Sequence, residues 1–98
     1  MIEDFSDNPL SLNSYSWRMS ELEINLDDAL EKINIGLDLI EKSNPSYPQF
    51  LDTKAEVLWK MKLFDEAIEV INEAILIDNK SEYYKEQKTK FLNSKEGM

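Results

Sequence analysis

Apolar residues recur along the chain at the spacings of three and four residues that are typical of amphipathic helices. The first stripe consists of Leu12, Tyr15, Met19 and Leu22, and we expect it to be the core face of its helix. Similar stripes follow in four later segments, and short polar breaks separate them. The pattern predicts an all-α protein with about five helices, at residues 9–23, 26–43, 47–62, 64–78 and 81–93.

Polar residues that can cap helices stand at the expected helix starts. Asn8 precedes a proline, which is favoured at the first helical position, and Asn25 and Ser81 precede two of the later helices. Ser46 is followed three residues later by Gln49, which is the spacing of a capping box. We therefore expect each of these side chains to accept hydrogen bonds from the amides of the first turn.

Small residues occupy the apolar faces of the three middle segments. Ala67 and Ala74 lie seven residues apart on one helical face, and Ala29 and Ala55 stand within the two preceding segments. Gly36 lies seven residues after Ala29, and a glycine within a helix costs roughly 1 kcal/mol relative to alanine, which hints at close packing. The pattern predicts antiparallel helix pairs whose backbones approach closely.

Composition limits the function more than it specifies one. The chain has 98 residues, which is enough for one small domain, and it contains no cysteine and no histidine. These absences remove the commonest general base, the commonest nucleophile pair and the commonest transition-metal ligands. The acidic pairs Asp27–Asp28 and Asp65–Glu66 open helices, where the helix dipole already favours them. We expect no enzymatic activity, no catalytic residue, no metal and no cofactor.

The charge is strongly negative and unevenly distributed. The formal net charge is −9, with 17 acidic and 6 basic residues in 1–79 and 3 acidic and 5 basic residues in 80–98. Such a surface repels phosphate backbones, and no segment approaches the roughly 20 apolar residues of a membrane span. We therefore expect no nucleic-acid partner and no membrane partner. The acidic start lacks a secretory signal, so we expect a cytoplasmic protein, unless the chain is a fragment of a longer exported one.

Two segments repeat each other at a distance of 38 residues. The segment from Leu26 to Ile33 aligns with the segment from Phe64 to Ile71, and each has two acidic residues followed by an alanine. With Ala55 in the preceding helix, this pattern resembles the tetratricopeptide repeat, a two-helix unit of roughly 34 residues that stacks into an α–α superhelix. The resemblance implies one domain over residues 1–98, with repeats at about 9–43 and 47–79, a capping helix at about 81–93, and flexible ends at 1–7 and 94–98.

The resemblance also implies a function and a site. In this family the first helix of each unit lines a concave groove that binds a peptide or partner protein. The groove here is rich in acidic residues, so we expect a neutral or basic partner. For Trp59, ordinary packing is about as good an interpretation as binding, whereas for Trp17 we favour the groove. The residues implied to contact a partner are Leu10, Asn13, Trp17, Ser20, Glu21, Gln49, Asp52, Glu56, Trp59 and Lys60.

A second interpretation assigns the chain a structural role. The runs Leu12–Trp17, Asn25–Leu30 and Leu51–Thr53 also resemble divergent repeat pairs near the C-terminal ends of longer bacterial proteins, some of which carry thioredoxin-like domains. The chain would then be a structural or dimerising tail, and a homodimer stays open. Two repeats leave an apolar end near Leu10 and Trp17, which residues 1–7, a second copy or a missing domain could cover.

Overall fold

The structure, a computed structural model, describes residues 8–97 and contains five α-helices in that range. The predicted all-α class and the number of helices are confirmed. The expectations for residues 1–7 and for Met98 lie outside the described residues. The helices are α1 (Pro9–Leu22), α2 (Leu26–Leu39), α3 (Tyr47–Lys60), α4 (Phe64–Ile77) and α5 (Glu82–Glu96).

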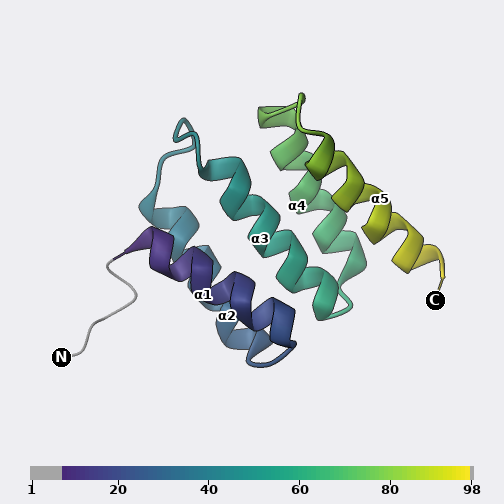
Figure 1. Cartoon of the computed structure of the whole chain (residues 1–98), viewed down its shortest axis with the longest axis horizontal. Coiled ribbons are helices and arrows are strands. Elements are labelled where there is room, and N and C mark those ends of the chain that lie inside the picture. The colour runs from purple at the N-terminus through teal and green to yellow at the C-terminus, as the bar shows by residue number, and fades with distance from the viewer. Residues whose placement is uncertain (1–7, 98) are drawn as a thin grey trace.

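Consecutive helices pack against each other in antiparallel order (Figure 1). Helices α1, α3 and α5 lie in a front layer, and α2 and α4 lie behind them (Figure 1). Helix α3 also contacts α1 directly, so the two front helices share an interface besides their contacts with the rear layer. This arrangement gives the front layer a surface to which alternate helices of the chain contribute.

The predicted small residues lie at the helix contacts. Ala29, Ala55, Ala67 and Ala74 have no exposed surface, which confirms the close antiparallel packing of the middle helices. Gly36 is also buried, but a methyl group at its Cα would stand 3.4 Å from the Phe50 ring, which is ordinary contact. The packing there is close, yet it leaves room for an alanine.

Helix α1 buries a different face from the one predicted. Leu12 is fully buried as expected, but Leu22 is 54% exposed, and the other fully buried residues of α1 are Ser16 and Ser20. The Ser16 hydroxyl donates a hydrogen bond of 2.8 Å to the Ala29 carbonyl, so a small polar side chain lies at the contact between α1 and α2. The apolar stripe missed this face because serine is not counted as a core residue.

Two of the predicted helix caps are present. The Asn8 side chain accepts hydrogen bonds from the amides of Leu10 and Ser11, at 3.0 and 3.4 Å. The Ser81 hydroxyl accepts one from the amide of Tyr84 at 3.3 Å. Both capping residues have extended backbones, which is the conformation that allows a side chain to turn back onto the first turn.

The caps predicted at Asn25 and Ser46 are wrong, because the backbone at each residue has the wrong conformation. Asn25 has a left-handed backbone and its amide group donates to the Met19 sulfur. Ser46 is already in the right-handed helical region, and its backbone amide donates to the Asn44 side chain at 2.8 Å. The connection before α3 is thus closed by an asparagine turn and not by a capping box.

Helix α5 closes the core as the pattern predicted. Phe91 has no exposed surface and joins the cluster of Ala67, Ile71 and Ala74, and Tyr84 packs against the same cluster. The helix extends to Glu96, beyond the predicted end at residue 93. Ser94 explains part of this extension, since its hydroxyl accepts a hydrogen bond from the Trp59 indole at 2.8 Å and so fastens the last turn to α3.

Candidate functional site

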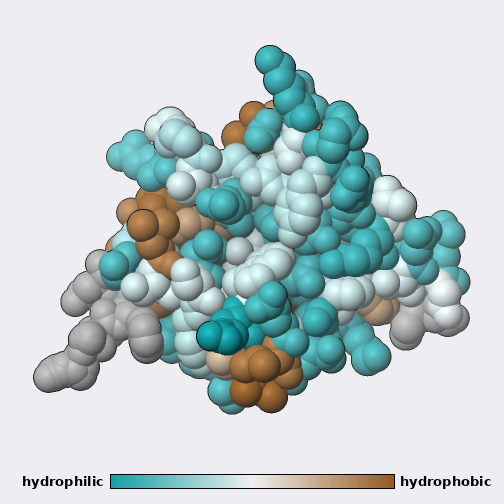
Figure 2. Space-filling model, in the orientation of Figure 1, coloured by the Kyte–Doolittle hydropathy of each residue, from teal (hydrophilic) through white to brown (hydrophobic). Residues whose placement is uncertain are grey.

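A cleft of about 440 Å³ opens on the front layer between α1, α3 and α5. Figure 2 shows that residues of intermediate hydropathy occupy the middle of this face, while the strongly apolar patches lie toward its edges. The volume lies within the range of small-molecule and side-chain pockets. The residues lining the cleft are Asn13, Ser14, Trp17, Arg18, Glu21, Gln49, Asp52, Thr53, Tyr83 and Tyr84.

Half of the residues predicted to contact a partner line this cleft. Asn13, Trp17 and Glu21 come from α1, and Gln49 and Asp52 come from α3. They share the cleft because successive turns of α1 and α3 run side by side in the front layer (Figure 1). Five residues that the resemblance implied therefore share one cleft, although they come from two separate helices.

The other predicted residues lie elsewhere. Leu10 is 62% exposed and lines a second, more open depression along α1, which shares Ser14 and Arg18 with the cleft. Ser20 is fully buried, and its hydroxyl donates to the Trp17 carbonyl at 2.6 Å. Trp59 and Lys60 line a separate, smaller pocket near the C-terminal end of α3. Glu56 is only 7% exposed and does not line the main cleft.

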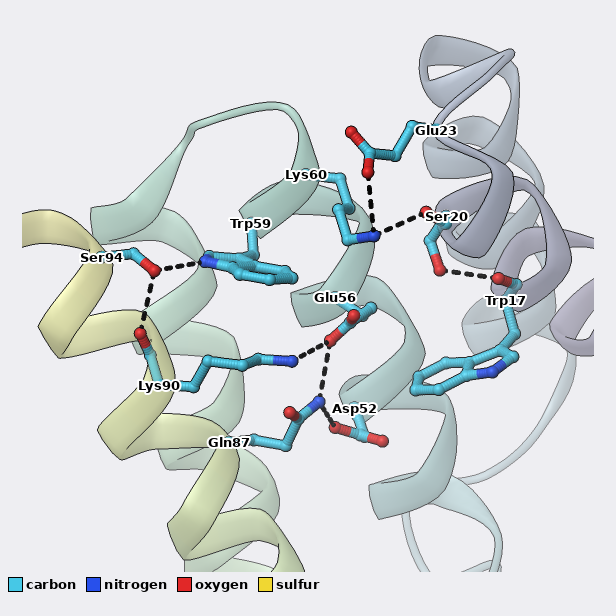
Figure 3. Close-up of polar contacts among 10 residues, drawn as sticks. All are labelled: Trp17, Ser20, Glu23, Asp52, Glu56, Trp59, Lys60, Gln87, Lys90 and Ser94. Carbon is cyan, nitrogen blue, oxygen red and sulfur yellow. Dashed lines mark hydrogen bonds and ion pairs between the residues drawn. The ribbon is translucent and has the colours of Figure 1, made fainter.

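Trp59 joins α3 to α5. Its ring lies 5.9 Å from the ring of Phe91, and the Lys90 ammonium stands 4.1 Å above the indole (Figure 3). The indole nitrogen donates to Ser94, so one side chain makes aromatic, cation–π and hydrogen-bond contacts with α5. These contacts favour the packing interpretation of Trp59.

Lys60 joins α3 to α1 at the same end of the cleft. Its ammonium donates to the Ser20 carbonyl at 3.1 Å and lies 3.5 Å from the Glu23 carboxylate (Figure 3). The Ser20 carbonyl already accepts the Glu23 backbone amide at 3.2 Å, so Lys60 adds a second hydrogen bond to it. Lys60 therefore links the C-terminal ends of α1 and α3.

A buried polar cluster lies between α3 and α5, and of its members only Asp52 lines the cleft. The Gln87 amide donates to both Asp52 and Glu56, at 3.0 and 2.9 Å, and the Lys90 ammonium lies 3.1 Å from the same Glu56 oxygen (Figure 3). Asp52, Glu56 and Gln87 are each at least 93% buried. Polar groups buried to this extent are costly unless they are paired, and this network pairs them across two helices.

Burial changes the titration of two side chains in the cleft. Burial raises the pKa of Asp52 to about 6, and the charge of Glu56 raises it too, while hydrogen bonds from Gln87 and Tyr83 and the charge of Lys90 lower it. Burial likewise raises the pKa of Tyr83, helped by the charges of Asp52 and Glu56. Tyr83 therefore stays a neutral hydroxyl, whereas Asp52 changes charge in the mildly acidic range.

One side-chain atom in the wall of the cleft has no hydrogen-bond partner. The Asn13 Oδ1 atom is buried within the described structure and accepts no hydrogen bond. Asn13 lies on the same face of α1 as Trp17. The cleft therefore retains an unused acceptor beside its aromatic wall.

Sequence reasoning missed the contribution of α5 to the cleft. Tyr83 and Tyr84 line it, together with Arg18 on α1 and the smaller residues Ser14 and Thr53. The apolar pattern of α5 predicted a covering role alone. The sequence did contain one signal, because the expected helix starts at Ser46 and Ser81 are 35 residues apart, about the length of a tetratricopeptide unit. In the structure, the Gln87–Asp52 and Trp59–Ser94 hydrogen bonds join α5 to α3 over the same separation.

Comparison of the chain with protein-family models, with curated proteins and with solved structures found no match. None of the five helices in the described range is long and apolar enough to cross a membrane. Within residues 8–97, no group of three or more acidic side chains is placed to hold a metal ion.

Proposed function

We propose that this chain is a non-enzymatic interaction domain of the tetratricopeptide type, and that it binds a segment of a partner polypeptide in the cleft between α1, α3 and α5. The observation that carries the proposal is the cleft itself, to which three alternate helices contribute side chains. The absence of cysteine and histidine from the sequence agrees with a binding function.

The packing of the helices supports the repeat interpretation. Ser16 in α1 and Ala55 in α3 are both fully buried small residues, and each lies on the first helix of a predicted repeat. Helices α1 and α3 lie in contact in the front layer, as the first helices of neighbouring repeats would. On this interpretation α5 is the first helix of an incomplete third unit, which extends the cleft by one wall.

The chemistry of the lining supports a polypeptide ligand. Trp17 and two tyrosines supply rigid aromatic surface, which recurs among the residues that dominate binding energy at protein interfaces. Exposed polar side chains, Gln49 and Glu21 among them, surround this surface and can meet the backbone of a bound segment. The combination of aromatic anchor and polar rim suits a short peptide more than a flat protein surface.

Selection from a displayed library of random peptides against the whole chain tests the proposal. We expect binders whose affinity falls about tenfold or more in Trp17→Ala and several-fold in Gln49→Ala, since both side chains line the cleft. Leu76→Ala is the matched control, because Leu76 is 82% exposed on α4, outside the cleft. Circular dichroism confirms that each variant keeps its helices. Binders that are insensitive to both cleft variants, or a library without binders, would contradict the proposal.

A further inference from the structure

The polar cluster beneath the cleft contains one more negative charge than its own cations neutralise. Asp52 and Glu56 lie one turn apart on α3, with 4% and 7% of their surfaces exposed. Lys90 forms an ion pair with Glu56, whereas no lysine or arginine among residues 8–97 lies within 4.0 Å of the Asp52 carboxylate. Gln87 bonds to both carboxylates but brings no charge.

The Asp52 carboxylate accepts hydrogen bonds from Gln87 and Tyr83 but has no ion-pair partner, and it lines the cleft. Asp52 lines it together with Trp17, and Figure 3 shows the Trp17 ring lying near the Asp52 carboxylate, with Gln87 on the other side of that carboxylate. One Asp52 oxygen accepts the Gln87 amide at 3.0 Å. A ligand in the cleft therefore meets a carboxylate whose charge the protein has not balanced.

The walls around this carboxylate are aromatic. Trp17 from α1 and Tyr83 and Tyr84 from α5 line the same cleft. The faces of aromatic rings attract cations, and this attraction grows where water is excluded. A carboxylate floor with aromatic walls is the arrangement that suits a positively charged group with an apolar stem.

We propose, on the basis of the proposed function, that the cleft selects partner segments by a lysine or arginine side chain, whose stem lies between Trp17 and Tyr83 and whose charge pairs with Asp52. A neutral apolar side chain there would exclude water from the Asp52 charge without pairing it, which is unfavourable. An acidic side chain would be repelled. The same chemistry would bind the cationic side chain alone, at lower affinity.

Several charged and titratable groups surround the Asp52 carboxylate. Glu56 belongs to α3 itself, Tyr83, Tyr84 and Lys90 come from α5, and Arg18 and Glu21 come from α1 and line the same cleft. Both tyrosines stay neutral because their pKa values are raised, and the pKa of Asp52 is raised into the mildly acidic range. Arg18 adds a positive charge to the cleft and therefore opposes a bound cation.

The pH dependence of binding follows from the pKa of Asp52. That pKa is about 6 in the empty cleft, and a paired cation lowers it. The cation therefore binds the ionised form preferentially, and its affinity falls as the pH falls through the pKa of the empty protein. Between a pH of about 7.5 and a pH of about 5, the affinity should drop by nearly tenfold.

Nuclear magnetic resonance titration of the whole chain with three capped amino acids tests the inference. The probes are the Nα-acetyl methylamides of lysine, arginine and norleucine, and the readout is the indole resonance of Trp17. We expect the lysine and arginine probes to bind in the millimolar range, several-fold more tightly than norleucine. Norleucine has the lysine stem without the charge, so it isolates the contribution of the cation.

Matched variants assign the effect to the carboxylate. Asp52→Asn should remove the preference for lysine over norleucine and the pH dependence, while Arg18→Gln should strengthen lysine binding. Asp65→Asn removes the same charge from an exposed position on α4 and should change neither. In the Asp52→Asn variant the side-chain oxygen can still accept the Gln87 hydrogen bond, and the new amide group can donate to the Tyr83 hydroxyl, so the network keeps its shape.

The outcomes separate this inference from the proposed function. If norleucine and lysine bind equally, or if Asp52→Asn leaves the preference unchanged, the inference is wrong. In that case, library peptides without a basic residue whose affinity depends on Trp17 would still support the proposed function. If the lysine probe binds and its binding depends on Asp52 while the library gives no binder, the inferred cation pocket is supported and the proposed peptide-binding function is wrong.

Discussion

Asp52 is a buried carboxylate that the fold tolerates at a cost. Its folded-state pKa of about 6 lies above the ordinary value of 3.8, so the folded protein binds the proton more tightly than the unfolded chain does. The contribution of this group to stability is therefore complete below a pH of about 4 and is lost as the pH rises through about 6. At neutral pH the ionised side chain costs up to about 3 kcal/mol.

Removing the Asp52 charge should raise the free energy of unfolding by the amount that the ionised side chain costs. We expect Asp52→Asn to be more stable than the natural chain by up to about 3 kcal/mol at neutral pH, with an advantage that shrinks toward zero near pH 4. Urea denaturation followed by tryptophan fluorescence at several pH values measures both curves. Asp65 is an exposed carboxylate on α4, so the free energy of unfolding of Asp65→Asn should vary with pH as that of the natural chain does. A gap between the Asp52→Asn curve and the natural one that does not vary with pH would contradict the buried-charge account.

Single residues also show what the sequence could and could not reveal. The resemblance to the tetratricopeptide repeat implied that Trp17 and Asp52 line a groove, and both line the cleft. Apolar periodicity missed the buried serines of α1, since a serine that bonds to a neighbouring carbonyl looks polar in sequence but occupies a core position. The capping role predicted for Asn25 was wrong, because no local sequence pattern predicts its left-handed backbone.

At the scale of helices, α5 both covers the core and completes the cleft. Its inner face carries Phe91 against the alanines of α4, and Gln87 and Lys90 against the carboxylates of α3. The outer positions of the helix are polar, so its sequence resembles a weakly amphipathic surface helix. Few apolar residues mark this helix, so the sequence indicated that it covers the core but not that its polar side chains reach α3.

Two adjacent residues of α5 should differ sharply in their contribution to stability. Phe91→Ala should lower the free energy of unfolding by about 3 to 5 kcal/mol, because it removes a fully buried ring that also contacts Trp59. Leu92→Ala, at a position that is 38% exposed, should cost about 1 kcal/mol or less. Chemical denaturation of both variants measures the difference. Similar losses at the two positions would mean that α5 does not pack through Phe91.

Helix existence and helix ends follow from different physics. The five helices could be predicted because many residues contribute to each periodic pattern. Helix ends depend on one or two backbone angles, and Ser46 and the extension of α5 to Glu96 were misjudged for that reason. The resemblance to a repeat implied that α1 and α3 line the cleft. The contribution of α5 became visible only in the structure, because it depends on contacts between residues far apart in sequence.

At the scale of the whole molecule, charge and apolar surface have opposite effects on self-association. The most exposed large apolar residues are spread over three helices, with Leu10 and Leu22 on α1, Leu39 on α2 and Leu76 on α4. On the face drawn in Figure 2 the strongly apolar areas form separate patches. A stable dimer needs about 800 Å² of continuous surface from each partner. A net charge of −9 on each copy also opposes association.

We therefore expect the chain to be a monomer of 11.5 kDa, which argues against the dimerising-tail alternative. Sedimentation equilibrium over a wide concentration range measures the mass directly. The measurement should be repeated at about 1 M salt, where repulsion is screened beyond about 3 Å and any contact held apart by charge would form. A mass that stays at the monomer value under both conditions leaves the cleft as the surface for partners. A dimer at either salt concentration would favour the structural role and would require mapping of the cleft in the assembled form.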